Sequence, residues 1–388
     1  MLIWEATGER FVFNLREVSG ALGDLGTLLP LTLGILAVSG HAPTPVLLGF
    51  AAFYVVTALV YRLPIPVQPM KAVAAVILTA GVPVAGVAAS GVMIGAVLLL
   101  LGATGWIDRV ARSVPRSVLA GLQLGLGLAL GLFAARLIGH APATGLAILG
   151  LLIGLQFAPR LPAAIIALAA AILLGWAIGD PGLGFVGDPV EGFALPAWPS
   201  AADLATSFTV LTLPQLSLTL SNAVLLTALL AGDYFGTKAE HVTPARLSVT
   251  SGLANLLLVP FGALPMCHGA GGLAAHHRFG ARSGTAPLLL GLALAALALA
   301  PGRIAVDLLS AVPVAGLGAL LLVAAAELAL SRRLFDGKPS CLPVIAATAG
   351  VTLWIDPFWG LLAGCGAELV RVAVLRRLRP GGAGRQPE

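Results

Sequence analysis

Two segments that combine proline, glycine and polar side chains lie inside otherwise apolar stretches of the chain. The first, PIPVQPMKAV, carries Gln68 and Lys71, and the second, GALPMCHGAGGLAAHHRFG, carries His268. Residues before proline favour an extended conformation, so each segment is predicted to begin extended and to continue as a short helix. The first turn of each helix offers unpaired N–H groups and a partial positive charge, and Lys71 adds a full charge. Two such helix starts facing each other are suited to bind an anion.

The candidate anion ligands lie at the starts of these short helices and on one face of a further helix. They are Gln68, Pro69, Met70, Lys71, Cys267, His268, Gly269, Ala270, Gly271, Gln215 and Asn222. Pro69 suits a first helical turn, so the first short helix is expected to begin there. The glycines let a ligand approach the backbone amides closely. Gln215 and Asn222 are spaced to share a helical face with Thr219 and can donate to an oxyanion.

The composition places both segments inside a membrane. The chain has 388 residues, of which 58% are apolar and only 10% charged, and its mean hydropathy is +0.99. Apolar windows of about 20 residues, long enough to span a bilayer, recur along nearly the whole length. The chain is therefore predicted to be an all-α polytopic membrane protein. Fourteen spans are expected, at 17–38, 45–61, 68–80, 83–104, 115–135, 143–158, 161–178, 211–231, 243–259, 267–279, 284–300, 311–330, 340–355 and 357–375.

The Lys and Arg residues predict how these spans are oriented. With both termini in the cytoplasm, the outer segments contain only Arg136 and Arg303, as expected when basic residues stay inside. Seven spans per half make the second half inverted, and the two proline-broken segments take matching places in the halves. The expected division is a first repeat at 1–178, an extracytoplasmic connection at 179–210, a second repeat at 211–376 and a short cytoplasmic tail at 377–388.

Other roles remain open for the polar residues of the candidate site. Asp24 is an acid within an apolar span, where a carboxylate is costly and usually paired or functional. It can be a partner of Lys71, a proton carrier or a structural hydrogen-bonding acid. Lys71 can instead extend toward the membrane surface, and Gln68 can cap the broken helix. His268 begins the second short helix, where its N–H is expected to face the anion, whereas His276 is expected at the membrane interface.

Several other classes of site are not supported by the sequence. The three histidines at 268, 276 and 277 lack a cysteine or acid at the spacing of a tetrahedral zinc site, so no metal and no cofactor is expected. The glycines of GLQLGLGLALG are predicted to pack helices rather than to bind a dinucleotide. The net charge of +5 is explained by topology and not by a nucleic-acid partner. No catalytic constellation is found, so an enzyme is not expected.

Three motifs resemble one transporter family closely. VSGALGDLGTLLPL, PIPVQPMKAVAAV and GALPMCHGAGGLAAHHRFGARSG, together with the sequence between about Leu15 and Val374, are similar to the molybdate transporter family, relatives of the sulfate permeases. The resemblance implies fourteen spans in two inverted seven-span repeats, a core domain and a gate domain, and molybdate as substrate. The larger sulfate permeases carry a cytosolic regulatory domain after the last span. Only RRLRPGGAGRQPE follows the last span here, so that domain is expected to be absent.

The expected function is secondary active transport of molybdate by alternating access, with the anion held at mid-membrane. No GxxxxGK[ST] motif is present, so ATP is not expected to drive transport directly. Sulfate or another tetrahedral oxyanion is the alternative substrate, and an anion channel is a further alternative. The protein is expected in the lipid bilayer of the inner or plasma membrane, and the sequence leaves a homodimer open.

Overall fold

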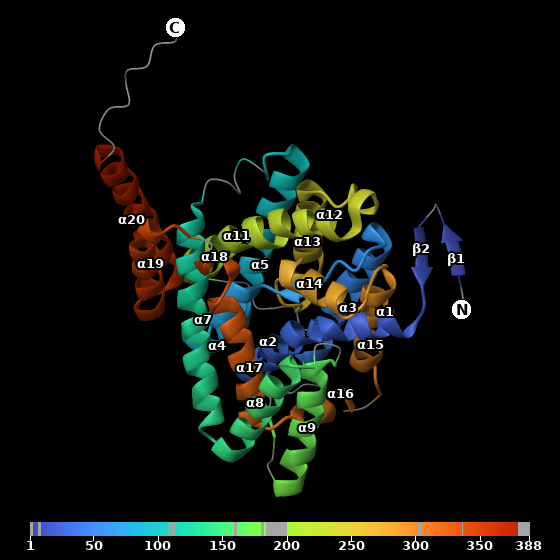
Figure 1. Cartoon of the computed structure of the whole chain (residues 1–388). Coiled ribbons are helices and arrows are strands. Elements are labelled where there is room, and N and C mark those ends of the chain that lie inside the picture. The colour runs from blue at the N-terminus through green and yellow to red at the C-terminus, as the bar shows by residue number, and fades with distance from the viewer. Residues whose placement is uncertain are drawn as a thin grey trace.

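The computed structural model describes residues 3–6, 9–107, 109, 114–158, 161–179, 182–183, 200–301, 304–335 and 337–378, and within them the chain is mainly helical (Figure 1). The helices of the first half are α1 (Leu15–Gly23), α2 (Leu25–Val38), α3 (Pro43–Tyr61), α4 (Lys71–Ala80), α5 (Val84–Thr104), α7 (Arg116–Ile138), α8 (Pro142–Gln156) and α9 (Ala163–Ile178). Those of the second half are α10 (Ala201–Thr206), α11 (Leu213–Leu218), α12 (Thr227–Phe235), α13 (Pro244–Leu258), α14 (Ala270–Arg278), α15 (Thr285–Ala298), α16 (Ile304–Ser310), α17 (Val314–Ala329), α18 (Arg332–Phe335), α19 (Leu342–Trp354) and α20 (Pro357–Leu378).

Every predicted span overlaps one helix or one run of successive helices. The first is bent by 43° between α1 and α2, at Asp24, where neighbouring glycines weaken the helix. A continuous helical run occupies Ala201–Ala239 and so begins inside the segment predicted as a connection. Within this run, η1 (Ser207–Thr212) and η2 (Thr219–Leu226) are π-helical, a rare form that occurs often at functional sites.

The first short helix begins at Lys71, and the prediction that Pro69 starts it is wrong. Pro69 belongs to β3 (Gln68–Pro69), which pairs antiparallel with β4 (Met266–Cys267). Met70 is the extended N-cap residue, and its N–H donates to the backbone of the second extended segment at 3.0 Å. The strand pairing therefore keeps Pro69 extended and shifts the helix start by two residues, to Lys71.

An antiparallel hairpin at the N-terminus was not expected for an all-α chain. Its strands are β1 (Ile3–Ala6) and β2 (Glu9–Val12), and they lie on the opposite side of the molecule from α19 and α20 (Figure 1). Both strands contain β-branched and aromatic residues, which favour the extended conformation. The hairpin is too short to alter the helical architecture around the candidate site.

The helices have the length and surface of a membrane protein. Five described helices are long and apolar enough to cross a bilayer, or six when the bent α1–α2 pair is counted as one span. Large apolar side chains are exposed around the outside, including Phe157 and Trp176, with 86% and 84% of their surface accessible. Large apolar side chains exposed on the outside of the helices are suited to contact lipid and not water.

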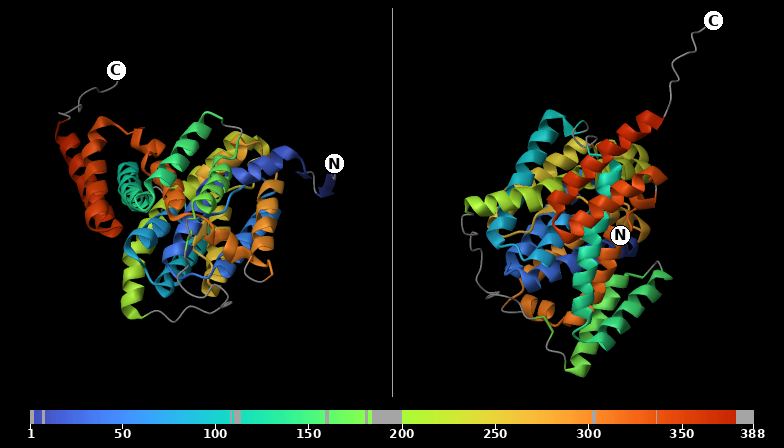
Figure 2. Two further views of the ribbon diagram at one scale, coloured as in Figure 1. Left: turned by 90° about the horizontal axis from the view of Figure 1, so that it is seen from below. Right: turned by 90° about the vertical axis from the view of Figure 1, so that its left-hand side faces the viewer.

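The helices form two groups that meet at the candidate site. In one, α7 packs against α17, α19 and α20, and α8 packs against α17 and α9; we call this set the α7 group. In the other, α3 packs against α15, α5 against α13, and α1 against α14 and α15; together with α2, α4, α11 and α12 these form the α4 group. Figure 2 shows α19 and α20 beside α7 at one side of the molecule. Contacts of α4 with α7 and of α2 with α17 join the two groups.

The paired strands β3 and β4 bring the starts of α4 and α14 together. Asn255 on α13 holds β4 in place, because its side chain donates to the carbonyl of Met266 at 2.6 Å and accepts from the Met266 N–H at 3.0 Å. These bonds pair the backbone N–H and C=O groups of Met266, which form no helical hydrogen bonds. Inside a membrane, the backbone groups of an extended segment need such partners. The two extended segments are thus fixed on both sides, and they position the residues that follow them.

Candidate anion-binding site

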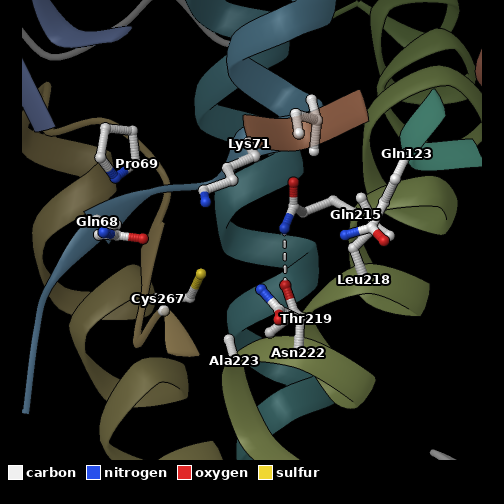
Figure 3. Close-up of a pocket in the computed structure, with 12 residues that line it drawn as sticks. Gln68, Pro69, Lys71, Gln123, Gln215, Leu218, Thr219, Asn222, Ala223 and Cys267 are labelled. Carbon is white, nitrogen blue, oxygen red and sulfur yellow. Dashed lines mark hydrogen bonds between the residues drawn. The ribbon is translucent and has the colours of Figure 1, made fainter. Parts of the chain in front are cut away.

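A small cavity lies beside the paired strands, where the two groups of helices meet (Figure 3). It is lined by Gln68, Pro69, Lys71, Gln123, Gln215, Leu218, Thr219, Asn222, Ala223, Cys267, Gly269 and Leu328. Gln123 belongs to α7 and Leu328 to α17, and the other lining residues belong to the α4 group and its strands. The cavity volume is about 20 Å³, which is room for about one water molecule. The π-helical segment and its neighbours supply Gln215, Thr219 and Asn222 on one face, as their spacing predicted.

The start of α14 is open toward this region. Gly269 is the N-cap residue, and no side chain caps the helix. The N–H groups of the first turn, at residues 270–272, have no intrahelical acceptor by the geometry of an α-helix. Gly271 is exposed, and a Cβ built on it would lie 3.8 Å from Nζ of Lys71. A full positive charge and the positive end of a helix therefore converge at Gly271.

The start of α4, in contrast, is closed by Gln215. Its Oε1 accepts from the N–H groups of Ala72 at 2.8 Å and of Val73 at 3.2 Å, and its Nε2 donates to Oγ1 of Thr219 at 2.8 Å. The acceptor position at this helix start is thus already filled by a side chain. Both helix starts were expected to face the anion. In the structure, the start of α4 is instead capped by Gln215, a side chain that also lines the cavity.

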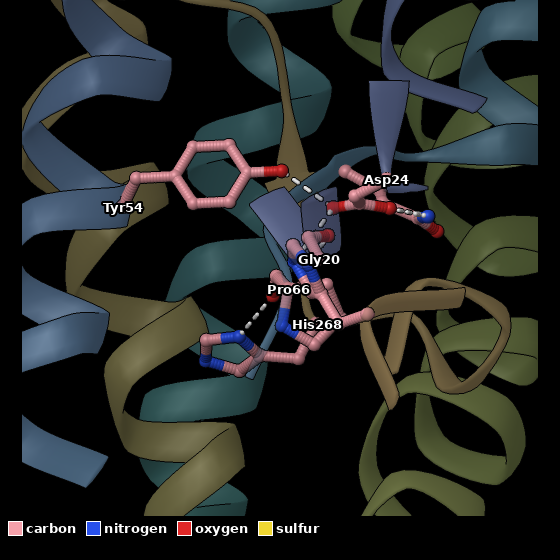
Figure 4. A network of polar contacts seen from close by, with 7 residues as sticks. Gly20, Asp24, Tyr54, Pro66 and His268 are labelled. Atoms are coloured by element: carbon pink, nitrogen blue, oxygen red, sulfur yellow. Dashed lines mark hydrogen bonds and ion pairs between the residues drawn. The ribbon is translucent and has the colours of Figure 1, made fainter. Parts of the chain in front are cut away.

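Lys71 has no ion-pair partner among the described residues, and Asp24 is engaged elsewhere (Figure 4). Asp24 is only 1% exposed. Its Oδ2 accepts from the hydroxyl of Tyr54 at 2.5 Å, and its Oδ1 accepts from Nε2 of Gln68 at 2.5 Å. Nε2 of His276 lies 3.7 Å from Oδ2. Of the roles left open for Asp24, the direct ion pair with Lys71 is not seen.

Glycines at the start of α14 make room for this network. A Cβ on Gly269 would overlap Oε1 of Gln68, and a Cβ on Gly272 would lie 2.6 Å from Nε2 of Gln68. Distances this short do not occur between real side chains, so both positions require glycine as long as Gln68 keeps its place. Gly271 is different, since a Cβ there meets only the flexible end of Lys71.

The side chain of His268 points away from the cavity. Its Nδ1 lies 2.9 Å from the carbonyl oxygen of Pro66, and its Nε2 lies 2.9 Å from Oγ1 of Thr250. The ring also packs against Phe53 and Tyr61, with ring centroids 4.9 and 5.6 Å away. Both ring nitrogens are satisfied inside the α4 group, so the ring fastens β4 and the start of α14 to the neighbouring helices.

Three further predicted ligands, Met70, Ala270 and Gly271, are not among the residues that line the cavity. Met70 and Ala270 are buried beside it, with 1% and 2% of their surface exposed, whereas Gly271 is exposed. The expectation of an interfacial His276 is wrong, because this residue is fully buried and its Nδ1 lies 2.7 Å from the carbonyl oxygen of Gly20. The helix α14 turns this side chain inward, toward the bend at Asp24.

Two polar residues of the α7 group near the site were not singled out from the sequence. Gln123 lines the cavity and is 7% exposed, and its Oε1 has no hydrogen-bond partner in the described part of the chain. Glu327 on α17 is accessible, interacts with Thr27, and lies near enough to Lys71 and Asp24 for electrostatic interaction. A glutamine and a glutamate inside apolar spans are themselves the signal that could have identified both.

The packing role predicted for the glycines of α7 is confirmed. A Cβ on Gly125 would lie 2.6 Å from Cβ of Thr352, and Gly121 faces Thr348 in the same way. These glycines allow α7 and α19 to approach closely.

Among the described residues, no three His, Cys, Asp or Glu side chains are grouped so that they could hold a metal ion. The cavity is lined by one cation, Lys71, by neutral polar side chains and by apolar residues such as Leu218 and Leu328.

Solved structures show which class of protein has this fold. The transmembrane domain of the cyanobacterial bicarbonate transporter BicA aligns with a TM-score of 0.68 at 18% identity, covering 91% of this chain and 98% of that one. The murine anion transporter Slc26a9 in its inward-facing state aligns with a TM-score of 0.69 at 14% identity, covering 96% of this chain and 70% of that one. The chain is an integral membrane protein with the fold of these transporters.

Sequence comparisons place the chain within a family. The family described as "Molybdate transporter of MFS superfamily" matches residues 16–130 and 207–328. Molybdate transporter 1 of Arabidopsis thaliana is 31% identical over 411 residues, covering 91% of this chain and 87% of that protein. Molybdate transporter 2 of the same plant is 30% identical, covering 93% and 88%, respectively. The chain belongs to the molybdate transporter family.

Proposed function

We propose that the chain is a secondary active transporter of molybdate that binds the anion between Lys71 and the start of α14. The observation that supports this most strongly is the meeting of an unpaired ammonium with an uncapped helix start at Gly271. Lys71 is half-buried and forms no direct ion pair in the described part of the chain, and a ligand of opposite charge would offset the cost of placing such a cation in a membrane. The relatives of this chain are named molybdate transporters, and we take the proposed substrate from those names.

The proposed ligands are donors, as an oxyanion requires. Lys71 contributes a charged donor, and the N–H groups at 270 and 271 contribute the positive end of α14. Gln123 and Asn222 line the same cavity and can each donate an amide N–H. This combination surrounds a tetrahedral anion with hydrogen bonds from several directions without a metal or a second cation.

The proposed transport mechanism is alternating access through relative movement of the two helix groups. The α4 group is the proposed core domain and the α7 group the proposed gate domain. Gln123 and Leu328 close the cavity from the gate side, while the charge and the helix start belong to the core side.

The proposed topology follows the loop charges and the matching positions of the two broken spans. It has fourteen spans as two inverted seven-span repeats, with both termini in the cytoplasm and the protein in the inner or plasma membrane. The two short helices α4 and α14 would then complete two crossings that the extended segments begin. Sulfate has the same shape and charge as molybdate, and amide donors do not by themselves separate the two.

Uptake into proteoliposomes tests the proposed function. Purified protein reconstituted into liposomes is expected to accumulate labelled molybdate with saturable kinetics, and internal unlabelled molybdate is expected to accelerate uptake by exchange. Protein-free liposomes and the Lys71→Met variant serve as controls. Linear uptake without exchange would indicate a channel, and uptake of sulfate with molybdate excluded would overturn the choice of substrate.

A further inference from the structure

Gln68 bridges the buried Asp24 and the anion cavity. It is 1% exposed, its Nε2 donates to Oδ1 of Asp24 at 2.5 Å, and its side chain lines the cavity. Its Oε1 has no hydrogen-bond partner in the described part of the chain and points toward the cavity in Figure 3. A buried amide oxygen without a partner carries a free-energy cost, so its position calls for a physical reason.

The charge of Asp24 determines which end of the Gln68 amide faces the cavity. An ionised carboxylate only accepts hydrogen bonds, so it attracts Nε2 and leaves Oε1 on the cavity side. An acceptor oxygen there repels the oxygens of a bound anion. A protonated carboxyl can instead donate from Oδ1 to Oε1 of Gln68. The amide, which has the same shape after a half-turn, would then direct its Nε2 donor into the cavity.

We propose that Gln68 acts as this two-position relay, so that protonation of Asp24 and binding of the anion favour each other. The proposal rests on the anion-binding function proposed above and adds its regulation. One proton is taken up by Asp24 from water when the anion binds, and the same proton is released when the anion leaves. Affinity should therefore rise as the pH falls, by at most about tenfold per pH unit for a single linked proton.

The surroundings of Asp24 are compatible with one proton on Oδ1. Tyr54 donates to Oδ2 and so leaves Oδ1 to Gln68. His276 is bonded through Nδ1 to a backbone carbonyl, and its Nε2, which has no hydrogen-bond partner among the described residues, faces Oδ2 at 3.7 Å.

Two more charged groups act on this region from other helices. Glu327 on α17 lies near enough to interact electrostatically both with Lys71 on α4 and with Asp24. Protonation of Glu327 would also make the cavity more positive. It is therefore the competing explanation for any increase in affinity at low pH, and the experiment needs a variant that separates the two acids.

The test measures molybdate affinity of the full chain in detergent by calorimetry at about pH 6 and about pH 8, a range in which one linked proton changes affinity measurably. The wild type is expected to bind more tightly at the lower pH. Asp24→Asn mimics the protonated acid, because its amide can donate to Oε1 of Gln68. It is expected to bind equally well at both pH values, at the affinity of the wild type at low pH.

A second variant isolates the relay itself. Gln68→Met keeps the volume of the side chain and leaves Asp24 free to titrate, but it cannot transmit a hydrogen bond. We expect weak, pH-independent binding. Retention of the wild-type pH dependence in Gln68→Met would show that Asp24 acts through its charge alone, and would overturn the relay. Glu327→Gln is the matched control, and it should keep the pH dependence.

The outcomes separate this inference from the proposed function. Absence of molybdate binding by the wild type at both pH values would contradict the proposed function itself. Binding with the same affinity at both values would leave the function standing and reject the relay. Melting temperatures accompany each variant. If Gln68→Met does not fold, pH-dependent binding by Asp24→Asn is sufficient to reject the relay.

Discussion

The starts of α4 and α14 occupy matching places, yet they differ in what satisfies their backbone. At α4 the side-chain oxygen Oε1 of Gln215 accepts from the N–H groups of Ala72 and Val73, so this helix start is capped by a side chain from a distant helix. At α14 no side chain caps the first turn, and Gly271 is exposed. The first-turn N–H groups of α4 therefore have a side-chain acceptor without any ligand, whereas those of α14 have no side-chain acceptor.

This difference suggests a division of labour between the two halves of the chain. The α4 half contributes a side-chain charge, Lys71, and fixes its own backbone internally. The α14 half contributes backbone N–H groups and no charged side chain at its start. A single anion can satisfy both contributions at once, because the ammonium of Lys71 lies beside Gly271. We infer that the site is asymmetric, with the anion closer to α14 than to α4.

The largest expected effect follows removal of the charge. Lys71→Met should weaken molybdate binding by about 1–3 kcal/mol, which is the range for loss of a charge-assisted hydrogen bond. Calorimetry in detergent measures the change. Lys238→Met, at an exposed lysine at the end of the long helical run, is the matched control and should bind normally. Equal affinity in both variants would assign Lys71 a structural role.

The cap on α4 should affect stability more than binding. Gln215→Leu removes the acceptor for Ala72 and Val73, and loss of a helix cap costs about 0.5–2 kcal/mol. We expect a lower melting temperature with a smaller change in affinity. Gln156→Leu, at the exposed end of α8, is the control. A variant that binds more tightly would mean that the anion competes with Gln215 for α4, and the asymmetry would then be reversed.

The start of α14 predicts opposite results for two neighbouring glycines. Gly271→Ala should weaken binding several-fold, by about 1 kcal/mol for one obstructed hydrogen bond, at an unchanged melting temperature, because the added methyl group meets only Nζ of Lys71. Gly269→Ala should lower the melting temperature, because its methyl group displaces Gln68. Gly125→Ala, which clashes with α19, reports the effect of pure packing loss. Unaltered affinity in Gly271→Ala would argue against amide recognition.

The general location of the candidate cavity could be predicted from the sequence because its signals are local. Hydropathy marks the spans, and prolines before or within β3 and before β4 break two of them within a few residues of Lys71 and Gly271. The loop charges and the matching proline positions concern the whole topology, and the inverted repeat stays a prediction.

The details of the site depend on contacts that the local sequence does not contain. Gln215 caps a helix 143 residues away in the chain, and His268 bonds to Pro66 across 202 residues. Pro69 has a sequence that suits a helix start, but strand pairing overrides that preference. Gln123 lies among glycines and leucines typical of packing, so its place in the cavity depends on how α7 meets α4.

The asymmetric anion site is tested most directly by locating molybdenum in crystals of the transporter grown with molybdate, using anomalous scattering from the metal. We expect one peak beside Gly271, with oxyanion oxygens at about 2.7–3.2 Å from Nζ of Lys71 and from the N–H groups of the first turn of α14. Gln215 should remain bonded to α4 in the same structure. A peak at the start of α4 with Gln215 displaced, or a peak away from both helix starts, would contradict the account.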